Sequence, residues 1–223
     1  MSRAFAILKQ NPVVFFTMTV IAIVPAAILE ILFSESPAVI AFSGILNTIL
    51  SLVIQGAIAY AVFMAFKGGP VVSINDAVSK GMARLGPLVL AAILMGLGVG
   101  IGMLLLIIPG IILLCVWAVT IPACVVEGLG AIDSMKRSAE LTKGYRGAVF
   151  GLALIIGLIT FVFVGGCAAL GGAMGAPVVG GLLAAVLSIP LTAFSSVMYA
   201  VIYYDLRMIK EGVSIDKLAN VFD

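Results

Sequence analysis

Six long apolar segments constrain the fold of this chain more than any other feature of its sequence. They cover residues 12–33, 38–66, 87–108, 111–126, 148–166 and 178–208. A helix needs about 20 mainly apolar residues to cross a bilayer, and these segments reach or approach that length. Pro109 and Gly110 separate the third segment from the fourth, which would otherwise join it in one implausibly long helix. The sequence therefore predicts an all-α, polytopic membrane protein with six transmembrane helices.

Composition supports this interpretation. Of 223 residues, 63% are hydrophobic and only 10% are charged, whereas a soluble domain is closer to half apolar and a quarter charged. A single core of this size cannot bury the excess, so lipid must cover much of the surface. The first segment has no clear cleavage site after it, and we expect it to be a retained helix rather than a signal peptide.

The basic residues indicate the orientation of the chain. All 12 Lys and Arg lie at the ends of the segments that would share one side of the membrane. The loops on the other side, at residues 34–37, 109–110 and 166–177, contain none. Basic residues flanking membrane spans concentrate in the cytoplasm. We therefore expect both termini to be cytoplasmic.

Four stretches on the basic side are too short and too charged to span, and they have amphipathic helical patterns. Ser73 can cap one of them, with Asp76 three residues later in capping-box position. The apolar faces are Ala4, Phe5 and Leu8; Ile74, Val78, Met82 and Leu85; Ile132, Met135 and Ala139; and Ile215, Leu218 and Phe222. Short helices lying at the membrane interface fit this pattern.

These elements suggest an internal repeat within a single transmembrane domain covering residues 1–223. An amphipathic helix followed by a spanning hairpin would occur three times, at about residues 1–66, 71–126 and 130–209, with a last amphipathic helix at 213–222. Each unit would start and end in the cytoplasm. The predicted repeats are therefore parallel, unlike the inverted repeats of many transporters.

Reactive side chains are scarce. The chain has no histidine, which removes the commonest general base and metal ligand. Its three cysteines form no CxxC pair, and they are expected to be buried thiols rather than metal ligands. We expect no enzymatic activity, no cofactor, no metal and no nucleic-acid partner.

The main candidate site lies at the predicted cytoplasmic ends of the helices. It consists of Glu127, Asp205, Arg207 and Tyr203, with Tyr204 close in sequence. Such a polar cluster could bind a lipid head group, or it could hold the repeat units together.

Within the membrane, Asn47 and Gln55 are the strong amide groups of the second segment. Their simplest role is an interhelical hydrogen bond, which contributes on the order of 1 kcal/mol. No charged residue is predicted near the bilayer midplane, which argues against a proton- or sodium-coupled transporter.

Glycines and prolines predict close packing of the spans. Gly96, Gly98, Gly100 and Gly102 form two overlapping small-xxx-small pairs, a pattern that lets helix backbones approach closely. Pro25, Pro122 and Pro190 lie inside spanning segments, where each frees a carbonyl group and can kink its helix.

Several motifs resemble one group of prokaryotic membrane proteins. They are the run at residues 106–111 (LIIPGI), then Pro122, then the stretches at 127–128 (EG), 132–138 (IDSMKRS) and 141–144 (LTKG), and finally 203–207 (YYDLR) with 211–212 (EG). The group of bacterial and archaeal six-helix membrane proteins that they resemble includes the membrane domain fused to some glycerophosphoryl diester phosphodiesterases and the YciC-like proteins. The resemblance implies a six-helix protein of the prokaryotic plasma (inner) membrane. It implies no hydrolysis, because this chain carries no phosphodiesterase domain.

Two functions remain open at the level of the sequence. The first is a non-catalytic membrane scaffold or accessory subunit, which binds membrane lipids, a partner membrane protein or a second copy through its cytoplasmic amphipathic helices. The alternative is a transporter or permease subunit for a small or lipid-like substrate.

Overall fold

The computed structural model describes residues 2–32, 36–68 and 72–212. The helices are α1 (Ser2–Gln10), α2 (Pro12–Leu32), α3 (Pro37–Phe66), α4 (Ile74–Met82), α5 (Leu85–Leu105), α6 (Ile107–Val116), α7 (Thr120–Val126), α8 (Ala131–Thr142), α9 (Arg146–Thr160), the π-helix η1 (Phe161–Gly165), α10 (Gly166–Ala173) and α11 (Pro177–Glu211). The described residues contain no β-strand. The amphipathic helix predicted at residues 213–222 lies outside the described part of the chain.

Within the described residues, six helical stretches are long and apolar enough to cross a membrane, as many as the sequence predicts. They are Pro12–Leu29, Pro37–Phe66, Leu85–Leu105, Ile107–Val126, Arg146–Ala173 and Val178–Glu211. The fourth combines α6 and α7, and the fifth combines α9, η1 and α10.

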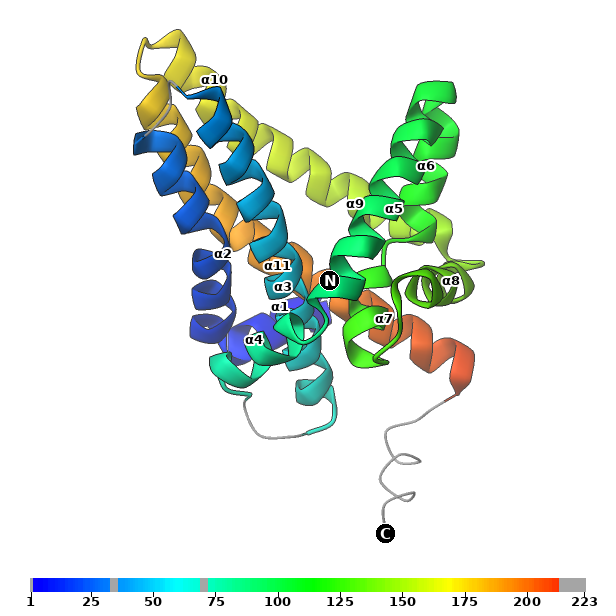
Figure 1. Ribbon diagram of the computed structural model, residues 1–223. Coiled ribbons are helices and arrows are strands. Elements are labelled where there is room, and N and C mark those ends of the chain that lie inside the picture. Colours follow the sequence, from blue (N-terminus) through cyan, green and yellow to red (C-terminus); the bar gives the residue numbers. More distant parts are fainter. Residues whose placement is uncertain (1, 33–35, 69–71, 213–223) are drawn as a thin grey trace.

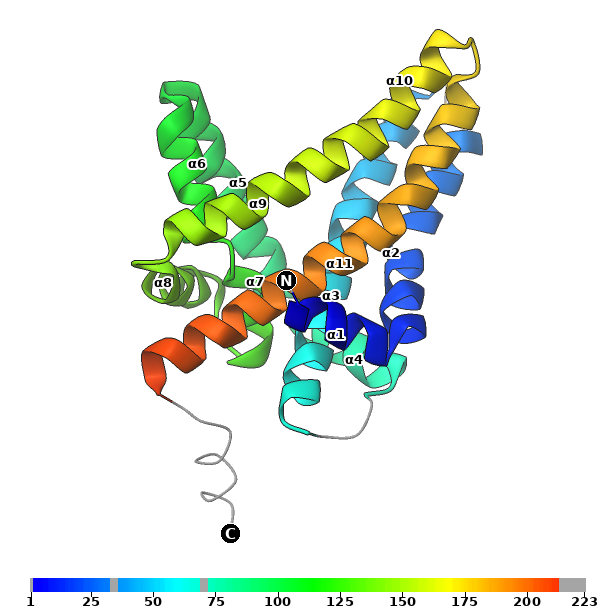
Figure 2. The same ribbon diagram turned by 180° about the vertical axis from the view of Figure 1, so that it is seen from behind.

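The molecule has the shape of a V (Figure 1). One arm contains α2, α3, α10 and the first part of α11, and the other contains α5 and α6. Helix α9 crosses from the second arm to the tip of the first, which is clearest from behind (Figure 2). The short helices α1, α4, α7 and α8 lie around the closed end of the V, where α11 also ends.

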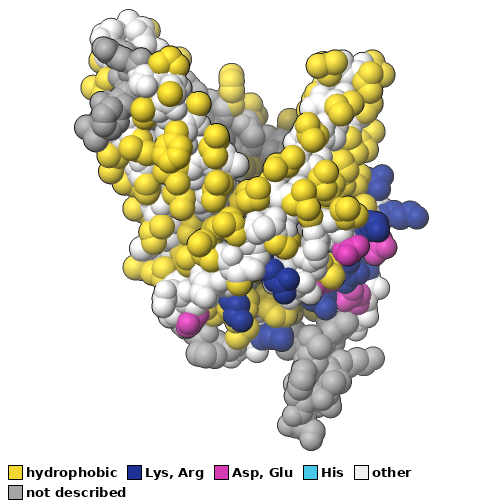
Figure 3. Space-filling model, viewed as in Figure 1, with side chains coloured by type: hydrophobic (Ala, Val, Ile, Leu, Met, Phe, Trp, Pro, Cys, Tyr) yellow, Lys and Arg dark blue, Asp and Glu magenta, His cyan; other side chains and the backbone are white. Residues whose placement is uncertain are grey.

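The core lies at this closed end. Its largest fully buried side chains include Tyr203, Met18, Ile58, Leu141 and Met198, which come from four helices. By contrast, Leu104 at the tip of the second arm is 89% exposed. The space-filling view shows hydrophobic side chains over both arms and the visible basic side chains gathered toward the closed end (Figure 3). This distribution fits lipid around the arms and a polar interface at the closed end.

The hairpin between the third and fourth spans turns at Leu106, and not at Pro109 and Gly110 as the sequence suggests. Leu106 is extended, with φ −159° and ψ 137°, and α6 starts at the next residue. Pro109 is therefore in the first turn of α6, where backbone N–H groups have no partner within the helix and a proline costs little. A Cβ on Gly102 would lie 3.0 Å from the Gly110 backbone, so both glycines serve the close approach of α5 and α6.

Only one of the two glycine pairs of α5 packs against another helix. A Cβ on Gly98 would lie 2.6 Å from the indole ring of Trp117, so this glycine and Gly102 pack against the fourth span. A Cβ on Gly96 or Gly100 would meet nothing within 4 Å. The prediction of close packing is thus confirmed for the pair Gly98 and Gly102, and the other pair faces open space.

The fourth span is interrupted between α6 and α7, at residues 117–119. Pro122 explains the break, because it lacks an N–H and its ring would clash with the carbonyl of residue 118 in a continuous helix. Two hydroxyl groups of α8 satisfy the freed backbone. Ser138 Oγ donates to the Val116 carbonyl oxygen (2.8 Å) and accepts from the Val119 N–H (3.2 Å). Thr142 Oγ1 also donates to the Val116 carbonyl oxygen (3.2 Å).

Helix α8 therefore packs through a face that sequence reasoning did not identify. The residues it buries are small or hydroxylated for the most part: Ala131, Ser134, Ser138, Leu141 and Thr142. The face predicted to be apolar is directed elsewhere, since Ile132 is 57% exposed. Hydroxyl side chains of α8 that form no recognisable sequence pattern thus bond the backbone groups left free between α6 and α7.

Replacing Ser138 with alanine should lower the free energy of unfolding by about 1–2 kcal/mol, because the buried Val119 N–H loses its acceptor. Titration of the folded protein with SDS in mixed micelles measures this change. Ser134→Ala is the matched control. The Ser134 hydroxyl bonds the Gly130 carbonyl of its own helix (2.7 Å), which also accepts from the Ser134 N–H. Equal costs for the two substitutions would contradict the proposed role of Ser138.

The predicted cap of α4 is confirmed. Ser73 Oγ accepts a hydrogen bond from the Asp76 N–H (3.1 Å) and donates one to Asp76 Oδ2 (2.7 Å). The helix buries Ala77 and Gly81, and a Cβ on Gly81 would lie 2.4 Å from the Val53 carbonyl oxygen of α3. The backbones of α4 and the spanning helix α3 are therefore in direct contact at Gly81.

Candidate functional site: a charged cluster and an intramembrane groove

Three of the four residues predicted as a polar cluster meet at the closed end of the V. Glu127 follows α7, while Tyr203 and Arg207 lie one turn apart on α11. The Tyr203 hydroxyl donates a hydrogen bond to Glu127 Oε1 (2.6 Å) and accepts one from Arg207 Nη1 (3.2 Å). Arg207 Nη1 is itself 4.0 Å from Glu127 Oε1. Tyr203 is 1% exposed, so its hydroxyl needs these partners.

Two residues that were not predicted complete the cluster. Arg137 of α8 places its Nε 3.0 Å from both carboxylate oxygens of Glu127. Glu211 at the end of α11 pairs with Arg137 and accepts a hydrogen bond from Arg207 Nε (2.8 Å). The spacing of Arg207 and Glu211, four residues apart on one helix, was a signal that sequence analysis could have used. No sequence signal links Arg137 to Glu127.

We call Glu127, Arg137, Tyr203, Arg207 and Glu211 the brace. It joins the end of α7 to the next helix, α8, and to the end of α11, which is distant in sequence. The side chains of its four ionic members are 15–30% exposed. Two carboxylates balance two guanidinium groups, so the brace has no net charge to offer a ligand. Its geometry therefore supports bracing more than binding of a lipid head group.

Asp205 does not belong to the brace, which corrects the predicted cluster. It points to α1, where its Oδ1 accepts a hydrogen bond from Arg3 Nη1 (2.7 Å). The two side chains are 38% and 64% exposed. Positions 203 and 207 share one face of α11, whereas position 205 lies on the opposite face. The neighbouring Tyr204 stacks on Phe66 of α3, with ring centroids 4.0 Å apart.

The two intramembrane amides have different surroundings. Asn47 is exposed, and its Oδ1 accepts a long hydrogen bond from Ser51 Oγ of the same helix (3.5 Å). The interhelical bond predicted for Asn47 is therefore not formed among the described residues. Gln55 is partly buried and lines the groove between the two arms.

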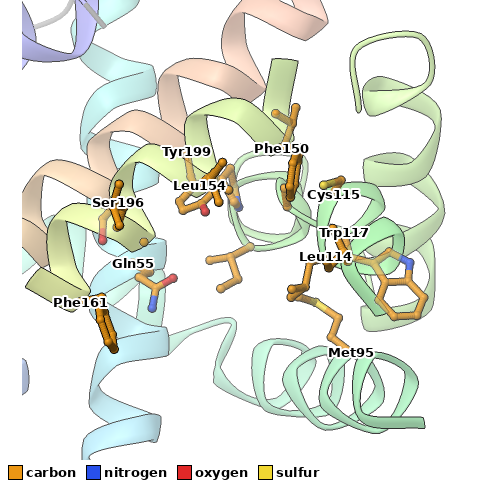
Figure 4. A pocket seen from close by; sticks show the side chains of 18 residues that line it. Gln55, Met95, Leu114, Cys115, Trp117, Phe150, Leu154, Phe161, Ser196 and Tyr199 are labelled. Carbon is orange, nitrogen blue, oxygen red and sulfur yellow. The ribbon is translucent and has the colours of Figure 1, made fainter. Parts of the chain in front are cut away.

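This groove has a volume of about 700 Å³. Helix α9 forms one wall, helices α3 and α11 a second, and α5, α6 and α7 a third; the hollow between the arms is visible in Figure 3. Figure 4 shows Gln55, Ser196 and Tyr199 on the α3 and α11 side, and Leu114, Cys115 and Trp117 across the groove. It lies between helices that are long and apolar enough to span a membrane.

The groove is mostly apolar, with a few polar groups on each side. Trp117 carries an indole N–H and Cys115 a thiol on one side. Gln55, Ser196 and Tyr199 carry the polar groups of the α3 and α11 side, and none of these three forms a hydrogen bond with another described residue. Most ligand sites combine apolar walls with a few polar groups in this way. The sequence singled out Gln55 but not its neighbours on α11, since a serine and a tyrosine in a 35-residue helix carry no pattern.

The described residues contain no group of three or more His, Cys, Asp or Glu side chains that could hold a metal ion. Cys115 and Cys124 are free and buried, and Cys167 is free and partly buried. Cys115 lines the groove.

Comparison with known proteins gives a family but no activity. No curated protein and no solved structure matches the chain. One family model matches residues 42–206, which is more than half of the 223 residues and runs from α3 to the last turns of α11. The chain therefore belongs to the family described as Domain of unknown function (DUF7847).

Proposed function

We propose that this protein is a non-catalytic integral membrane scaffold or accessory subunit. Its basic, closed end would face the cytoplasm and contact membrane lipids, a partner membrane protein or a second copy. The observation that carries the proposal is the gathering of α1, α4 and α8 around the closed end, where most of the basic side chains lie.

The charge pattern at this end supports contact with an anionic surface. Lys9, Lys80 and Lys143 are exposed and form no ion pair with a described carboxylate. Each basic residue close to anionic lipid contributes about 1 kcal/mol to membrane binding. The brace keeps its own charges neutralised, whereas these exposed lysines remain available to a lipid or a protein partner.

The order of the elements supports three parallel units. Helix α1 precedes the hairpin of α2 and α3; α4 precedes α5 and the broken span of α6 and α7; and α8 precedes α9–α10 and α11. We propose that residues 1–66, 71–126 and 130–209 are copies of one unit, in keeping with kinship to the prokaryotic six-helix proteins that the sequence resembles. The protein would then lie in the plasma (inner) membrane of a prokaryote with both termini in the cytoplasm.

Affinity purification from native membranes in a mild detergent tests the scaffold proposal. A tag on the full chain should recover a specific membrane protein, or anionic lipid beyond bulk composition, and Lys9→Gln, Lys80→Gln and Lys143→Gln together should weaken that recovery. Lone chains with neither partner nor retained lipid would contradict the proposal.

A separate experiment tests the topology. Reagents that label single cysteines at positions 35 and 143 should reach them from opposite sides of the membrane, and labelling of both from one side would overturn the topology.

The groove favours one alternative function, a transporter or permease subunit for a lipid-like substrate. Its apolar walls suit such a substrate far better than a polar solute. A π-helix in the fifth span adds a local irregularity of a kind frequent at functional sites. Flux or lipid scrambling in reconstituted vesicles would favour the transporter, and none should occur if the protein is a scaffold.

A further inference from the structure

We propose that the groove is a binding site for an anionic phospholipid, with an acyl chain along α9 and the phosphate group at Arg146. This site is separate from the surface proposed for the scaffold function, so either proposal can fail without the other.

The wall formed by α9 is a continuous apolar stripe. Its groove-lining residues recur at helical spacing and are Val149, Phe150, Ala153, Leu154, Gly157, Leu158 and, in η1, Phe161. Leu154, Leu158 and Phe161 are 58%, 62% and 76% exposed. Protein interiors tolerate few voids, because atoms beside an empty space lose their dispersion contacts. In a bilayer, an open apolar groove is therefore filled by hydrocarbon chain.

Arg146 gives the groove a cationic end. It is the first residue of α9 and lies three residues before Val149 and four before Phe150, so it continues the same helical stripe. Arg146 is exposed and forms no ion pair with a described carboxylate. Among cationic side chains, a guanidinium group is well suited to bind a phosphate.

The polar groups inside the groove favour a lipid over a plain hydrocarbon. Tyr199 lies beside Leu154, toward the Arg146 end of the groove, and is available to donate a hydrogen bond to an ester carbonyl group of the phospholipid, whereas Gln55 and Ser196 lie toward Phe161 (Figure 4). A polar group without a partner is costly in hydrocarbon, so Tyr199 gains from a ligand with oxygen acceptors. Apolar walls, an internal donor and a cation at one end match the chain, esters and phosphate of one molecule. The backbone carbonyls of a transmembrane helix are already bonded within that helix, so a partner helix of ordinary apolar composition offers neither the acceptors nor an anion for Arg146.

Photo-crosslinking of the full chain in nanodiscs tests the proposal. The probe is phosphatidylglycerol with a diazirine in its acyl chain, and the labelled peptides are identified by mass spectrometry. Labels should concentrate on Phe150, Leu154 and Leu158 of the groove rather than on Leu97 and Leu104, which are 59% and 89% exposed but do not line it. Even labelling of groove and outer surfaces would overturn the proposal.

Two glycines of α9 provide a matched pair of variants. Gly157 lines the groove and Gly151 does not, and a Cβ at either position meets nothing within 4 Å. Each methylene displaced from apolar contact lowers lipid affinity about fourfold, so Gly157→Leu, by displacing two of them, should lower retention of phosphatidylglycerol roughly 15-fold. Gly151→Leu should leave retention unchanged. Equal retention by the two variants in native mass spectrometry would overturn the proposal.

The head-group contact has its own control. Arg146→Gln should reduce the preference for phosphatidylglycerol over phosphatidylcholine about fivefold, because a basic residue beside anionic lipid contributes about 1 kcal/mol. Lys136→Gln removes the same charge from α8, which does not line the groove; this lysine already pairs with Asp133 (3.7 Å), so the variant should leave the preference unchanged. An unchanged preference in Arg146→Gln would overturn the assignment of the phosphate. If a co-purified protein were crosslinked within the groove, the occupant would be a protein partner rather than a lipid, and the whole proposal would be overturned.

Discussion

Replacing Glu127 with alanine is expected to lower the free energy of unfolding by about 2–3 kcal/mol, because it leaves Arg137 and the buried Tyr203 hydroxyl without their shared acceptor and removes the charge near Arg207. Glu127 accepts from Tyr203 at 2.6 Å and from Arg137 at 3.0 Å. The cost of breaking a fully buried pair is larger, but Arg137 and Arg207 keep 22% and 30% of their side-chain surface exposed. SDS titration in mixed micelles measures the change.

Two controls separate the brace from ordinary surface charge. Glu127→Gln keeps an oxygen that accepts from Tyr203 but removes the charge that faces Arg137, so its cost should fall between those of the wild type and Glu127→Ala. Asp205→Ala breaks an exposed pair with Arg3 and should cost at most about 1 kcal/mol. If Glu127→Ala and Asp205→Ala destabilise the protein equally, the brace is not the main polar contact of this end.

The second large effect is expected at Gly81, where α4 meets α3. A Cβ there would lie 2.4 Å from the Val53 carbonyl oxygen and 3.2 Å from the Val53 carbonyl carbon. These are backbone atoms, so no rotamer change can relieve the clash and the helices must separate. Gly81→Leu should therefore cost about 3 kcal/mol or more, or prevent recovery of folded protein.

Gly86→Leu is the matched control, since a Cβ on that glycine, in the first turn of α5, meets nothing within 4 Å. It should be recovered as a monodisperse protein with nearly unchanged stability in the same titration. Wild-type stability in Gly81→Leu would show that α4 does not pack on α3 at this distance. A free amphipathic helix at the membrane surface would then be the better description.

Local features of the fold could be predicted from the sequence because their causes are local. The spans follow from uninterrupted apolar segments, and the cap of α4 follows from Ser73 and Asp76, three residues apart. The close approach at Gly98 and Gly102 follows from small side chains four residues apart. Gly96 and Gly100 have the same spacing without a partner, which shows that the pattern permits close packing but does not choose the face.

The candidate site was only partly predictable. Glu127, Tyr203 and Arg207 were identified because polar residues at the ends of apolar helices are conspicuous. Asp205 was included because it is adjacent in sequence, although a two-residue step on a helix points a side chain to the opposite face. Arg137 was missed because its pairing with Glu127 depends on how α8 docks against the end of α7.

The sequence by itself determined that six helices can cross the membrane and, through the one-sided distribution of its basic residues, which orientation to expect. The hydrocarbon of the bilayer is the reason for both. It favours helices, because every backbone group inside it must be bonded within its own helix, and it keeps charged side chains at the ends of the spans, near water. The tertiary structure decided how Ser138 and Thr142 of α8 bond the backbone at the break near Pro122, which partners meet in the brace, and where the groove along α9 lies. Each of these depends on how separate helices dock. Lipid solvates every apolar face alike, so no simple sequence pattern encodes this docking.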